Sequence, residues 1–559
     1  MQLTGAEILL ECLMEQGVDT VFGYPGGAVL NIYDALAKYP HTIRHILPSH
    51  EQGAAHAADG YARATGKVGV CLATSGPGAT NLVTGIATAY MDSVPLVAIT
   101  GNVPSPLLGK DSFQEVDITG ITMPITKHNF IVKDVRNLAS VLRKAFYIAQ
   151  EGRQGPVLID IPKDITSQQT DFRCEVPKTI PKHTGLITAD AITEAIRLLQ
   201  SSKQPLIYAG GGVVSSNAAS DLLRFAEKVA SPVVSSLMGL GGFPGNHPLF
   251  CGLIGMHGMK TSNLASSSCD LLIAVGARFS DRVVSDIKRF ASSAQILHID
   301  IDPAEINKNI HTHHHITGDI KSVLERLNVA LEPLDIESKQ EWLSQISSWK
   351  TQFPLSYGKS GGLKPQYIIE RIHALTQGQA IITTEVGQNQ IWAAQSYTYT
   401  LPRTFISSGG LGTMGYGLGA SIGAQIGQPN KQVFNIAGDG SFRMNCNELA
   451  TAVEYELPII IVILNNHALG MVRQWQDLFY DKRYSQTTLT RGTDFVKLAE
   501  AYGALGLNLT RIEDVDTVLT QALEYSGTVV VNCEIDRDDK VFPIVPPGAA
   551  IEDVITEDS

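Results

Sequence analysis

Short apolar runs alternate with stretches of helical periodicity along the whole chain, and this alternation occurs in three successive segments. A short apolar run predicts a buried strand, and strands separated by helices predict a parallel sheet covered by helices. We therefore predict an α/β fold of three doubly wound parallel-sheet domains, at residues 1–166, 188–330 and 363–545. The predicted strands lie at 18–22, 43–47, 69–73, 95–100 and 157–161, then at 205–209, 232–235, 270–275 and 295–301, and finally at 380–383, 432–437, 458–464 and 528–534.

Two polar stretches separate the predicted domains. Residues 167–181 carry Pro, Lys, Thr and Gln without periodicity, which is typical of a linker. A second polar stretch, at 332–362, closes the second segment. The chain length agrees with this division, because 559 residues are too many for one hydrophobic core and domains usually hold roughly 100 to 200 residues.

The charge balance limits the kinds of partner. The chain has 43 Lys and Arg against 55 Asp and Glu, a net charge of −12, and no long basic block. Nucleic acid and anionic membranes are therefore not expected partners. The longest apolar run, at 458–464, is too short to span a bilayer.

The cysteines and the N-terminus indicate the compartment. The seven cysteines include no C-x-x-C pair, which fits scattered reduced thiols better than disulfides or structural zinc. The first residues alternate apolar side chains with glutamates, as an amphipathic helix does and a basic signal peptide does not. We expect a cytoplasmic protein.

The strongest chemical signal is a Gly438-Asp439-Gly440 turn after one predicted strand and an Asn465-Asn466 pair at the end of the next. Parallel strands present their carboxyl ends at one edge of a sheet, so Asp439 and Asn466 can converge. Their oxygens suit Mg²⁺, and the amides of Gly440 and Ser441 at a helix start can bind a diphosphate. The alternative is two turns without a ligand, but the pairing at strand ends favours a metal site.

Two glycine-rich turns are ambiguous. Residues 410–415 form a G-x-G-x-x-G sequence, but the acid available to hold a ribose after the next strand, Asp439, sits inside the Gly438-Asp439-Gly440 turn. We favour a close-packed turn beside the diphosphate. Gly210-Gly211-Gly212 resembles part of a nucleotide loop, for which nucleotide binding and simple loop packing are equal alternatives.

Glu51 follows the predicted strand at 43–47 and begins a helical run, so it either caps that helix or projects into a cleft. The glycine-rich turn at 74–81 follows the next strand and belongs to the same sheet edge. Trp475 is either a core residue or a functional one. The histidines at 311, 313, 314 and 315 have only Asp319 as a nearby carboxylate, so we expect a solvated loop there rather than a metal site.

Taken together, these motifs resemble those of thiamine diphosphate enzymes. The Asp439 and Asn466 segments match the motif that binds the cofactor through a metal. Three further motifs narrow the resemblance to the catalytic subunits of acetohydroxyacid synthase (acetolactate synthase), and it covers nearly the whole chain. The motifs of the pyrimidine-binding half are at 22–28, 50–53, 75–81 and 113–115, and those that narrow the family are at 276–283, 470–475 and 545–550.

This resemblance implies an activity. Such an enzyme decarboxylates pyruvate on thiamine diphosphate and transfers the two-carbon unit to pyruvate, giving 2-acetolactate, or to 2-ketobutyrate, giving 2-aceto-2-hydroxybutyrate, in branched-chain amino acid biosynthesis. It also implies Mg²⁺ and a structural FAD, a homodimer or homotetramer, and a small regulatory subunit. The alternatives are pyruvate oxidase, glyoxylate carboligase, the FAD-free catabolic acetolactate synthase and a non-catalytic paralogue. Glu51 disfavours glyoxylate carboligase, and the motif at 278–283 disfavours the FAD-free enzyme.

The resemblance also implies roles for single residues. Glu51 is the catalytic partner of the aminopyrimidine ring, and Asp439, Asn466 and the backbone oxygen of Ala468 bind the metal. Phe113, Gln114, Lys163, Arg278 and Trp475 contact substrates, with Trp475 favouring 2-ketobutyrate as acceptor. The implied thiamine diphosphate contacts are Tyr24, Gly27, Glu51, Pro77, Asn81, Gln114, Gly387, Gln388, Gly412, Met414, Gly438, Asp439, Gly440, Ser441, Asn466, Ala468, Gly470 and Met471.

An FAD site is implied in the middle segment. Three positions depart from the family pattern: Ser280 replaces an Asp beside the flavin motif, Asn389 a His, and Gly419 a Pro. We expect Ser280 to weaken one flavin contact. The implied flavin residues are Arg153, Gly210, Gly212, Leu253, Gly255, Met256, His257, Gly276, Arg278, Arg282, Asp300 and Asp319.

Overall fold

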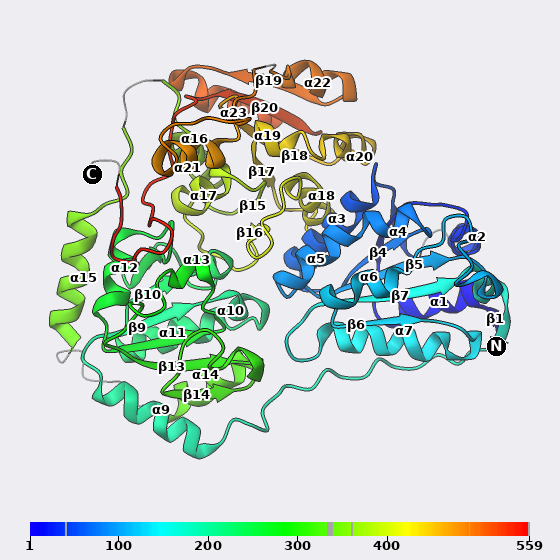
Figure 1. The fold of residues 1–559 in the computed structure, drawn as a ribbon, viewed down its shortest axis with the longest axis horizontal. Coiled ribbons are helices and arrows are strands. Elements are labelled where there is room, and N and C mark those ends of the chain that lie inside the picture. The colour runs from blue at the N-terminus through cyan, green and yellow to red at the C-terminus, as the bar shows by residue number, and fades with distance from the viewer. Residues whose placement is uncertain (40–41, 332–338, 359–361, 491, 557–559) are drawn as a thin grey trace.

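Three six-stranded sheets organise the protein in a computed structural model that describes residues 1–39, 42–331, 339–358, 362–490 and 492–556 (Figure 1). Every strand pair within these three sheets is parallel, so the predicted α/β class with three parallel sheets is confirmed. We call the units built on them the N-terminal, middle and C-terminal domains. In Figure 1 the N-terminal domain lies on the right, the middle domain at the lower left and the C-terminal domain at the top.

The N-terminal sheet has the order β3-β2-β4-β5-β7-β6. Its strands are β2 (Thr20–Gly23), β3 (Arg44–Ile46), β4 (Gly69–Ala73), β5 (Leu96–Asn102), β6 (His128–Ile131) and β7 (Pro156–Pro162). The helices around it are α1 (Gly5–Glu15), α2 (Leu30–Lys38), α3 (Glu51–Thr65), α4 (Pro77–Asn81), α5 (Val83–Met91), α6 (Ile118–Thr122), α7 (Val135–Gln150) and α8 (Lys163–Ser167).

The middle sheet has the order β11-β10-β9-β12-β13-β14. Its strands are β9 (Pro205–Ala209), β10 (Val233–Ser235), β11 (Phe250–Leu253), β12 (Leu271–Val275), β13 (Gln295–Asp300) and β14 (His314–Thr317). The helices of this domain are α9 (Ala189–Ser201), α10 (Gly211–Ser215), α11 (Ala219–Val229), α12 (Lys260–Ser268), α13 (Asp281–Val284), α14 (Ile320–Ala330) and α15 (Gln340–Gln352).

The C-terminal sheet has the order β16-β15-β17-β18-β20-β19. Its strands are β15 (Ile381–Thr384), β16 (Phe405–Ile406), β17 (Val433–Gly438), β18 (Ile459–Asn465), β19 (Leu505–Leu509) and β20 (Val529–Glu534). Its helices are α16 (Pro365–Thr376), α17 (Gln388–Ser396), α18 (Gly417–Gly427), α19 (Asp439–Phe442), α20 (Leu449–Glu454), α21 (Gly470–Phe479), α22 (Phe495–Tyr502) and α23 (Val515–Glu524).

Two sequence-based expectations, for the linker and for the histidine loop, were wrong, and the polar stretch between the second and third segments is in part helical. Part of the predicted linker at 167–181 is a strand, because β8 (Gln169–Asp171) pairs antiparallel with β1 (Gln2–Thr4). The polar stretch at 332–362 contains α15, whose Trp342 is buried against the middle domain; residues 332–338 and 359–361 of that stretch lie outside the described residues. His314 and His315 belong to the edge strand β14 and not to a loop.

The cores show how the N-terminal and C-terminal domains are joined. Side chains alternate across β18: Ile459, Ile461 and Ile463 face one core, while Ile460, Val462 and Leu464 face another. The first of these cores also contains Cys71 and Ala73 of β4 and residues of α3 and α18. The two domains therefore share one hydrophobic core.

Helices α3 and α18 pack so closely that small residues are required between them. A Cβ atom at Gly60 would overlap the backbone oxygen of Ala420, and one at Gly423 would overlap that of Ala57. Gly419 stands where the resembled family has a proline. An ideal Cβ atom at Gly419 would lie 2.8 Å from the Cβ of His56. The helix that begins with Glu51 is thus fixed against the C-terminal domain.

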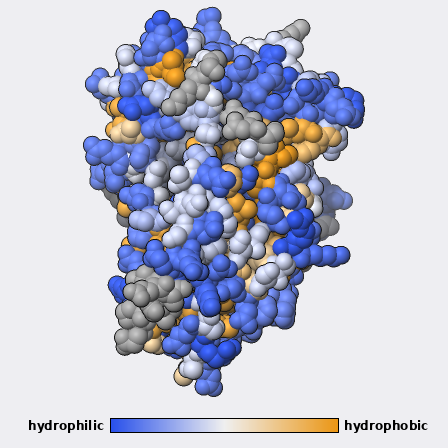
Figure 2. Space-filling model, turned by 90° about the vertical axis from the view of Figure 1, so that its left-hand side faces the viewer, coloured by the Kyte–Doolittle hydropathy of each residue, from blue (hydrophilic) through white to orange (hydrophobic). Residues whose placement is uncertain are grey.

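The face of the molecule that includes the middle and C-terminal domains is mostly hydrophilic (Figure 2). Figure 2 shows one face, on which hydrophilic residues predominate and apolar residues gather in a band towards the upper right. Within the described residues, no helix is both long enough and apolar enough to cross a membrane.

Candidate functional site

A small cavity of about 60 Å³ lies at the carboxyl ends of β17 and β18. These strands are neighbours, with Gly438 opposite Leu464, so the residues that follow them meet at one edge. The predicted convergence of Asp439 and Asn466 is therefore present. The predicted residues that line this cavity are Gly387, Gln388, Met414, Gly438, Asp439, Gly440, Ser441, Asn466, Ala468, Gly470 and Met471.

Asp439 begins α19 and is only 1% exposed. Burial raises the pKa of its carboxyl group to about 6, although electrostatic interactions with Arg443 and His467 act in the opposite direction. Its Oδ2 atom has no hydrogen-bond partner among the residues that the structure describes. A buried carboxylate oxygen without a partner is costly, so this atom fits a ligand for a cation.

Asn466 is oriented by two hydrogen bonds. Its Nδ2 donates to Oε1 of Gln388 (3.1 Å), and its Oδ1 accepts from the amide of Ala468 (3.2 Å). In the described parts of the chain, no three His, Cys, Asp or Glu side chains come together as a metal-binding group. A cation at this edge would therefore depend on the mixed carboxylate, amide and backbone oxygens that Mg²⁺ accepts.

A larger cavity of about 1040 Å³ lies where the three domains meet. Of the twelve residues predicted for a flavin, Gly255 is the one that does not line it. Gly387, Gly412, Met471 and Trp475 of the C-terminal domain line it too, and Gly387 and Met471 also line the small cavity, so the two cavities are adjacent. The predicted flavin residues on its wall are Arg153, Gly210, Gly212, Leu253, Met256, His257, Gly276, Arg278, Arg282, Asp300 and Asp319.

The glycines of this wall have a packing role. A Cβ atom at Gly210 would overlap the backbone oxygen of Gly276, and one at Gly212 would lie 2.6 Å from the Cα of Gly276. Gly276 itself has φ +58°. The close approach of two turns therefore explains Gly210 and Gly212 without a ligand, while their position on the cavity wall leaves nucleotide binding open.

The chemistry of the large cavity fits a flavin nucleotide. Its volume is at the upper end of the usual range for ligand pockets. Arg278 and Arg282 supply positive charge for a diphosphate in a chain of net charge −12, while Arg153 on the same wall pairs with Asp302 (3.2 Å) and Glu305 (2.6 Å). Oε2 of Glu305, which is buried, has no hydrogen-bond partner among the described residues and is thus a free acceptor on the wall. Ser280 lines the same wall.

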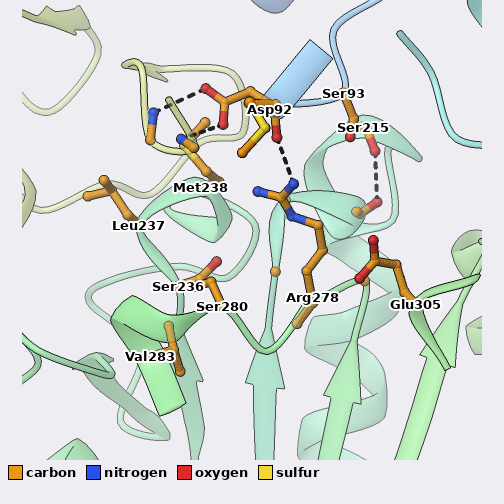
Figure 3. Close-up of a pocket in the computed structure, with 18 of the residues that line it drawn as sticks. Asp92, Ser93, Ser215, Ser236, Leu237, Met238, Arg278, Ser280, Val283 and Glu305 are labelled. Carbon is orange, nitrogen blue, oxygen red and sulfur yellow. Dashed lines mark hydrogen bonds between the residues drawn. The ribbon is translucent and has the colours of Figure 1, made fainter. Parts of the chain in front are cut away.

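Sequence reasoning missed Asp92, whose buried carboxylate joins the N-terminal domain to the loop 408–412 (Figure 3). It accepts hydrogen bonds from the amides of Gly409 (3.1 Å) and Gly410 (2.7 Å) and from Nη2 of Arg63 (2.9 Å). The preceding backbone oxygen, that of Met91, accepts from Nη1 of Arg278 (2.7 Å). Asp92 directly follows α5 and has no motif around it, so the sequence carried no signal for this contact.

The remaining predicted residues form a separate group at the carboxyl edge of the N-terminal sheet. Nδ2 of Asn81 donates to Oε2 of Glu51 (2.9 Å), and an ideal Cβ at Gly78 would lie 3.1 Å from Oε1 of Glu51. Phe113 is 88% exposed. None of the following lines either cavity: Tyr24, Gly27, Glu51, Pro77, Asn81, Phe113, Gln114 and Lys163.

Comparison with known families agrees with this arrangement. Residues 3–121 match the thiamine pyrophosphate enzyme N-terminal TPP binding domain, residues 192–327 the central domain, and residues 385–533 the C-terminal TPP binding domain. A probable acetolactate synthase large subunit of Methanocaldococcus jannaschii is 47% identical, with 99% of this chain and 95% of the relative covered.

Two bacterial relatives are similar over the same length. The acetolactate synthase isozyme 3 large subunit of Escherichia coli is 44% identical, and the acetolactate synthase large subunit of Haemophilus influenzae is 43% identical. Each comparison covers 99% of this chain and 98% of the relative. The chain therefore belongs to the acetolactate synthase large subunits, a family of thiamine pyrophosphate enzymes.

Proposed function

We propose that this protein is the catalytic subunit of an acetolactate synthase that joins two 2-keto acids. The observation that carries the proposal is the buried Asp439, whose Oδ2 lacks a partner among the described residues and which lies beside Asn466 in a family that binds thiamine pyrophosphate. The first substrate is pyruvate, and the acceptor is a second pyruvate or 2-ketobutyrate. The products belong to branched-chain amino acid biosynthesis.

Asp439, Asn466 and the backbone oxygen of Ala468 would hold Mg²⁺, and the amides of Gly440 and Ser441 would hold diphosphate oxygens. Thiamine diphosphate, when bound, supplies a carbon acid that adds to a keto group and accepts the electron pair left by carbon dioxide. Met414, on the wall of the small cavity, would support the cofactor between its rings.

Glu51 would exchange a proton with the pyrimidine ring. The hydrogen bond from Asn81 holds the Glu51 carboxylate in place. It lies outside both cavities of its own chain, whereas the metal residues line one of them. We therefore propose a homodimer in which Glu51 of one copy completes the site formed by Asp439 of the other. A homotetramer of two such dimers is compatible with this arrangement.

Arg278 and Trp475 line the large cavity and would contact the substrates. An aromatic wall at Trp475 offers apolar area to the extra methylene of 2-ketobutyrate and excludes water from it. Phe113, Gln114 and Lys163 would reach this channel from the second copy. FAD in the large cavity would be structural, because the reaction has no net oxidation or reduction.

Two further properties follow from the same reasoning. The relatives are named large subunits, so we propose that a small regulatory subunit binds this chain. We also propose a cytoplasmic location, because all seven cysteines are free.

The decisive experiment is an assay of the purified protein with thiamine diphosphate, Mg²⁺ and a mixture of pyruvate and 2-ketobutyrate. We expect 2-acetolactate and 2-aceto-2-hydroxybutyrate, with the second product in excess of its share of the substrate mixture, and a flavin absorption spectrum in the protein. Oxygen-dependent acetyl phosphate formation would instead identify a pyruvate oxidase. The absence of any carboligation product would refute the proposal.

A further inference from the structure

Glu448 is a fully buried carboxylate of the C-terminal domain that bonds to the backbone of the N-terminal domain. It ends the short helix η6 (Cys446–Glu448). Its Oε1 accepts from the amide of His50 (3.0 Å), and its Oε2 accepts from the amide of Ser49 (3.1 Å). The hydroxyl of Thr451 donates to Oε2 (2.7 Å) and so orients the carboxylate.

These two amides stand directly before Glu51, the first residue of α3. Both oxygens of Glu448 are therefore used to fix the backbone that leads into the catalytic residue. The position is also favourable for a negative charge, because the N-terminus of a helix carries a partial positive charge. Burial raises the pKa of Glu448, whereas the hydrogen bonds from Thr451, Ser49 and His50 lower it.

The Glu448 carboxylate packs tightly against the first turn of α3. An ideal Cβ atom at Gly53, in the first turn of α3, would overlap Oε1 of Glu448. None of the ion pairs among the described residues involves Glu448. A buried carboxylate without a cation depends on its donors, and here two of the three are the amides before Glu51.

We propose that Glu448 is a positioning residue that fixes the start of α3 and thereby holds the Glu51 carboxylate in the orientation that proton exchange with the cofactor requires. This inference rests on the proposed function. It assigns no contact with substrate or cofactor to Glu448 itself. Because Asp439 and Glu448 lie in one short segment, the same part of the chain carries a metal ligand and the anchor of Glu51.

The test uses Glu448→Gln in the full-length protein with FAD, Mg²⁺ and thiamine diphosphate. A glutamine keeps one acceptor oxygen but turns an NH₂ group towards a backbone N–H, so one of the two amides loses its bond. The informative measurement is the rate at which the thiazolium carbon proton of bound thiamine diphosphate exchanges with deuterium, because this rate depends on Glu51 and not on the substrates.

We expect the exchange rate and kcat to fall together by at least about tenfold, since misplacing a catalytic group by a small distance is enough to do so. The KM for pyruvate and the affinity for thiamine diphosphate with Mg²⁺ should stay within about threefold of wild type, because the residues that hold the metal are unchanged. Glu454→Gln is the matched control, since Glu454 is exposed at the end of α20, and it should behave as wild type.

A second variant covers the case in which Glu448→Gln does not fold. Thr451→Val removes the hydroxyl that donates to Glu448 (2.7 Å) and accepts from the amide of Ser49 (3.1 Å). It leaves the Glu448 carboxylate and its bond from the amide of His50 in place, so it should lower the exchange rate by a smaller factor with the same pattern. The inference is overturned if the folded variants exchange the proton at the wild-type rate. It is also overturned if they bind the cofactor more weakly and the exchange on bound cofactor is not slower. If wild type itself shows neither exchange nor carboligation, the proposed function fails instead.

Discussion

The buried carboxylate of Asp439 has an unusual environment for its charge. It is 1% exposed, burial raises its pKa to about 6, and its Oδ2 lacks a partner among the described residues. A bound cation would offset the cost of burying the negative charge and would give the Oδ2 atom a partner. A purely structural aspartate in this position would instead be expected to have both oxygens hydrogen-bonded. The residue therefore gives the most direct test of metal binding.

We predict that Asp439→Ala loses metal-dependent cofactor binding. The affinity for thiamine diphosphate with Mg²⁺ should fall at least about a hundredfold. Even mutation of a residue that only hydrogen-bonds to a metal ligand typically lowers metal affinity by about 10- to 100-fold, and Asp439 would be a ligand itself. Titration of the apoprotein followed by intrinsic fluorescence measures it. Asp481→Ala, at an exposed position, is the control. Unchanged affinity in the Asp439 variant would remove this residue from the metal site.

Glu385 provides a prediction about pH. It is fully buried after β15, where it accepts hydrogen bonds from the amides of Gly415 (2.7 Å) and Leu418 (3.3 Å). Desolvation raises its pKa from 4.5 to about 7, against the effect of these amides. The folded protein thus holds a proton on Glu385 that the unfolded chain has already released between pH 4.5 and 7.

The contribution of Glu385 to the free energy of unfolding should therefore fall as pH rises from about 4.5 to 7, by about 1.4 kcal/mol per pH unit, and stay constant above that window. Glu385→Gln removes this dependence. The thermal midpoint of the variant, relative to wild type, should rise between pH 5 and pH 7 in calorimetric scans. Glu524→Gln, at an exposed site, should show no such trend. A difference that is constant with pH would contradict the assignment.

At the scale of elements, the loop 408–412 depends on its contacts with the end of α5. Asp92 accepts from two amides of this loop and from Arg63, and Arg63 also bonds to Asp59 of its own helix (2.6 Å). The loop and the neighbouring Arg278 lie on the wall of the large cavity. Asp92 thus fixes one wall of the proposed flavin site from another domain.

We predict that Asp92→Asn weakens flavin binding on the order of tenfold. Asparagine keeps one acceptor oxygen and its NH₂ cannot accept, so one of the two loop amides loses its bond, and Arg63 loses one of its two charged partners. Flavin retained after gel filtration and equilibrium titration measure the change. Asp190→Asn, in the exposed first turn of α9, is the control. Wild-type flavin content in the Asp92 variant would show that the loop needs no such anchor.

The elements themselves were predictable to different degrees. All thirteen predicted strands are present, because interior parallel strands are apolar on both faces and give continuous apolar runs, as in Ile459–Asn465. The sequence missed β6, β11, β14 and β19, which are partly exposed and carry polar residues. All four of these are edge strands of their sheets.

At the scale of the whole molecule, the two groups of predicted site residues lie apart. The residues proposed to bind the metal line one cavity, whereas Glu51 lies at another sheet edge of the same chain. This arrangement predicts that complementation between two inactive variants restores activity. In a hybrid dimer of Glu51→Gln with Asp439→Ala, one of the two sites would combine an intact Glu51 with an intact Asp439.

We predict that each variant alone is inactive, with Glu51→Gln still binding the cofactor. Mixing equal amounts after reversible dissociation should restore about a quarter of the wild-type activity, because half of the random dimers are hybrids with one good site each. Carboligation measured before and after subunit exchange gives the result. No recovery, together with proven formation of hybrids, would place Glu51 and Asp439 of one chain in the same site.

The sequence by itself determined the parallel-sheet architecture and the convergence of Asp439 with Asn466. Both depend on local periodicity and on the rule that parallel strands end at one edge, which needs no knowledge of distant contacts. Only the tertiary structure decided that Asp92 anchors the loop 408–412, that Glu448 anchors the residues before Glu51, and that Glu51 lies outside the cavities. These contacts join residues more than 300 positions apart, and their formation depends on how whole domains pack, for which no short sequence pattern exists.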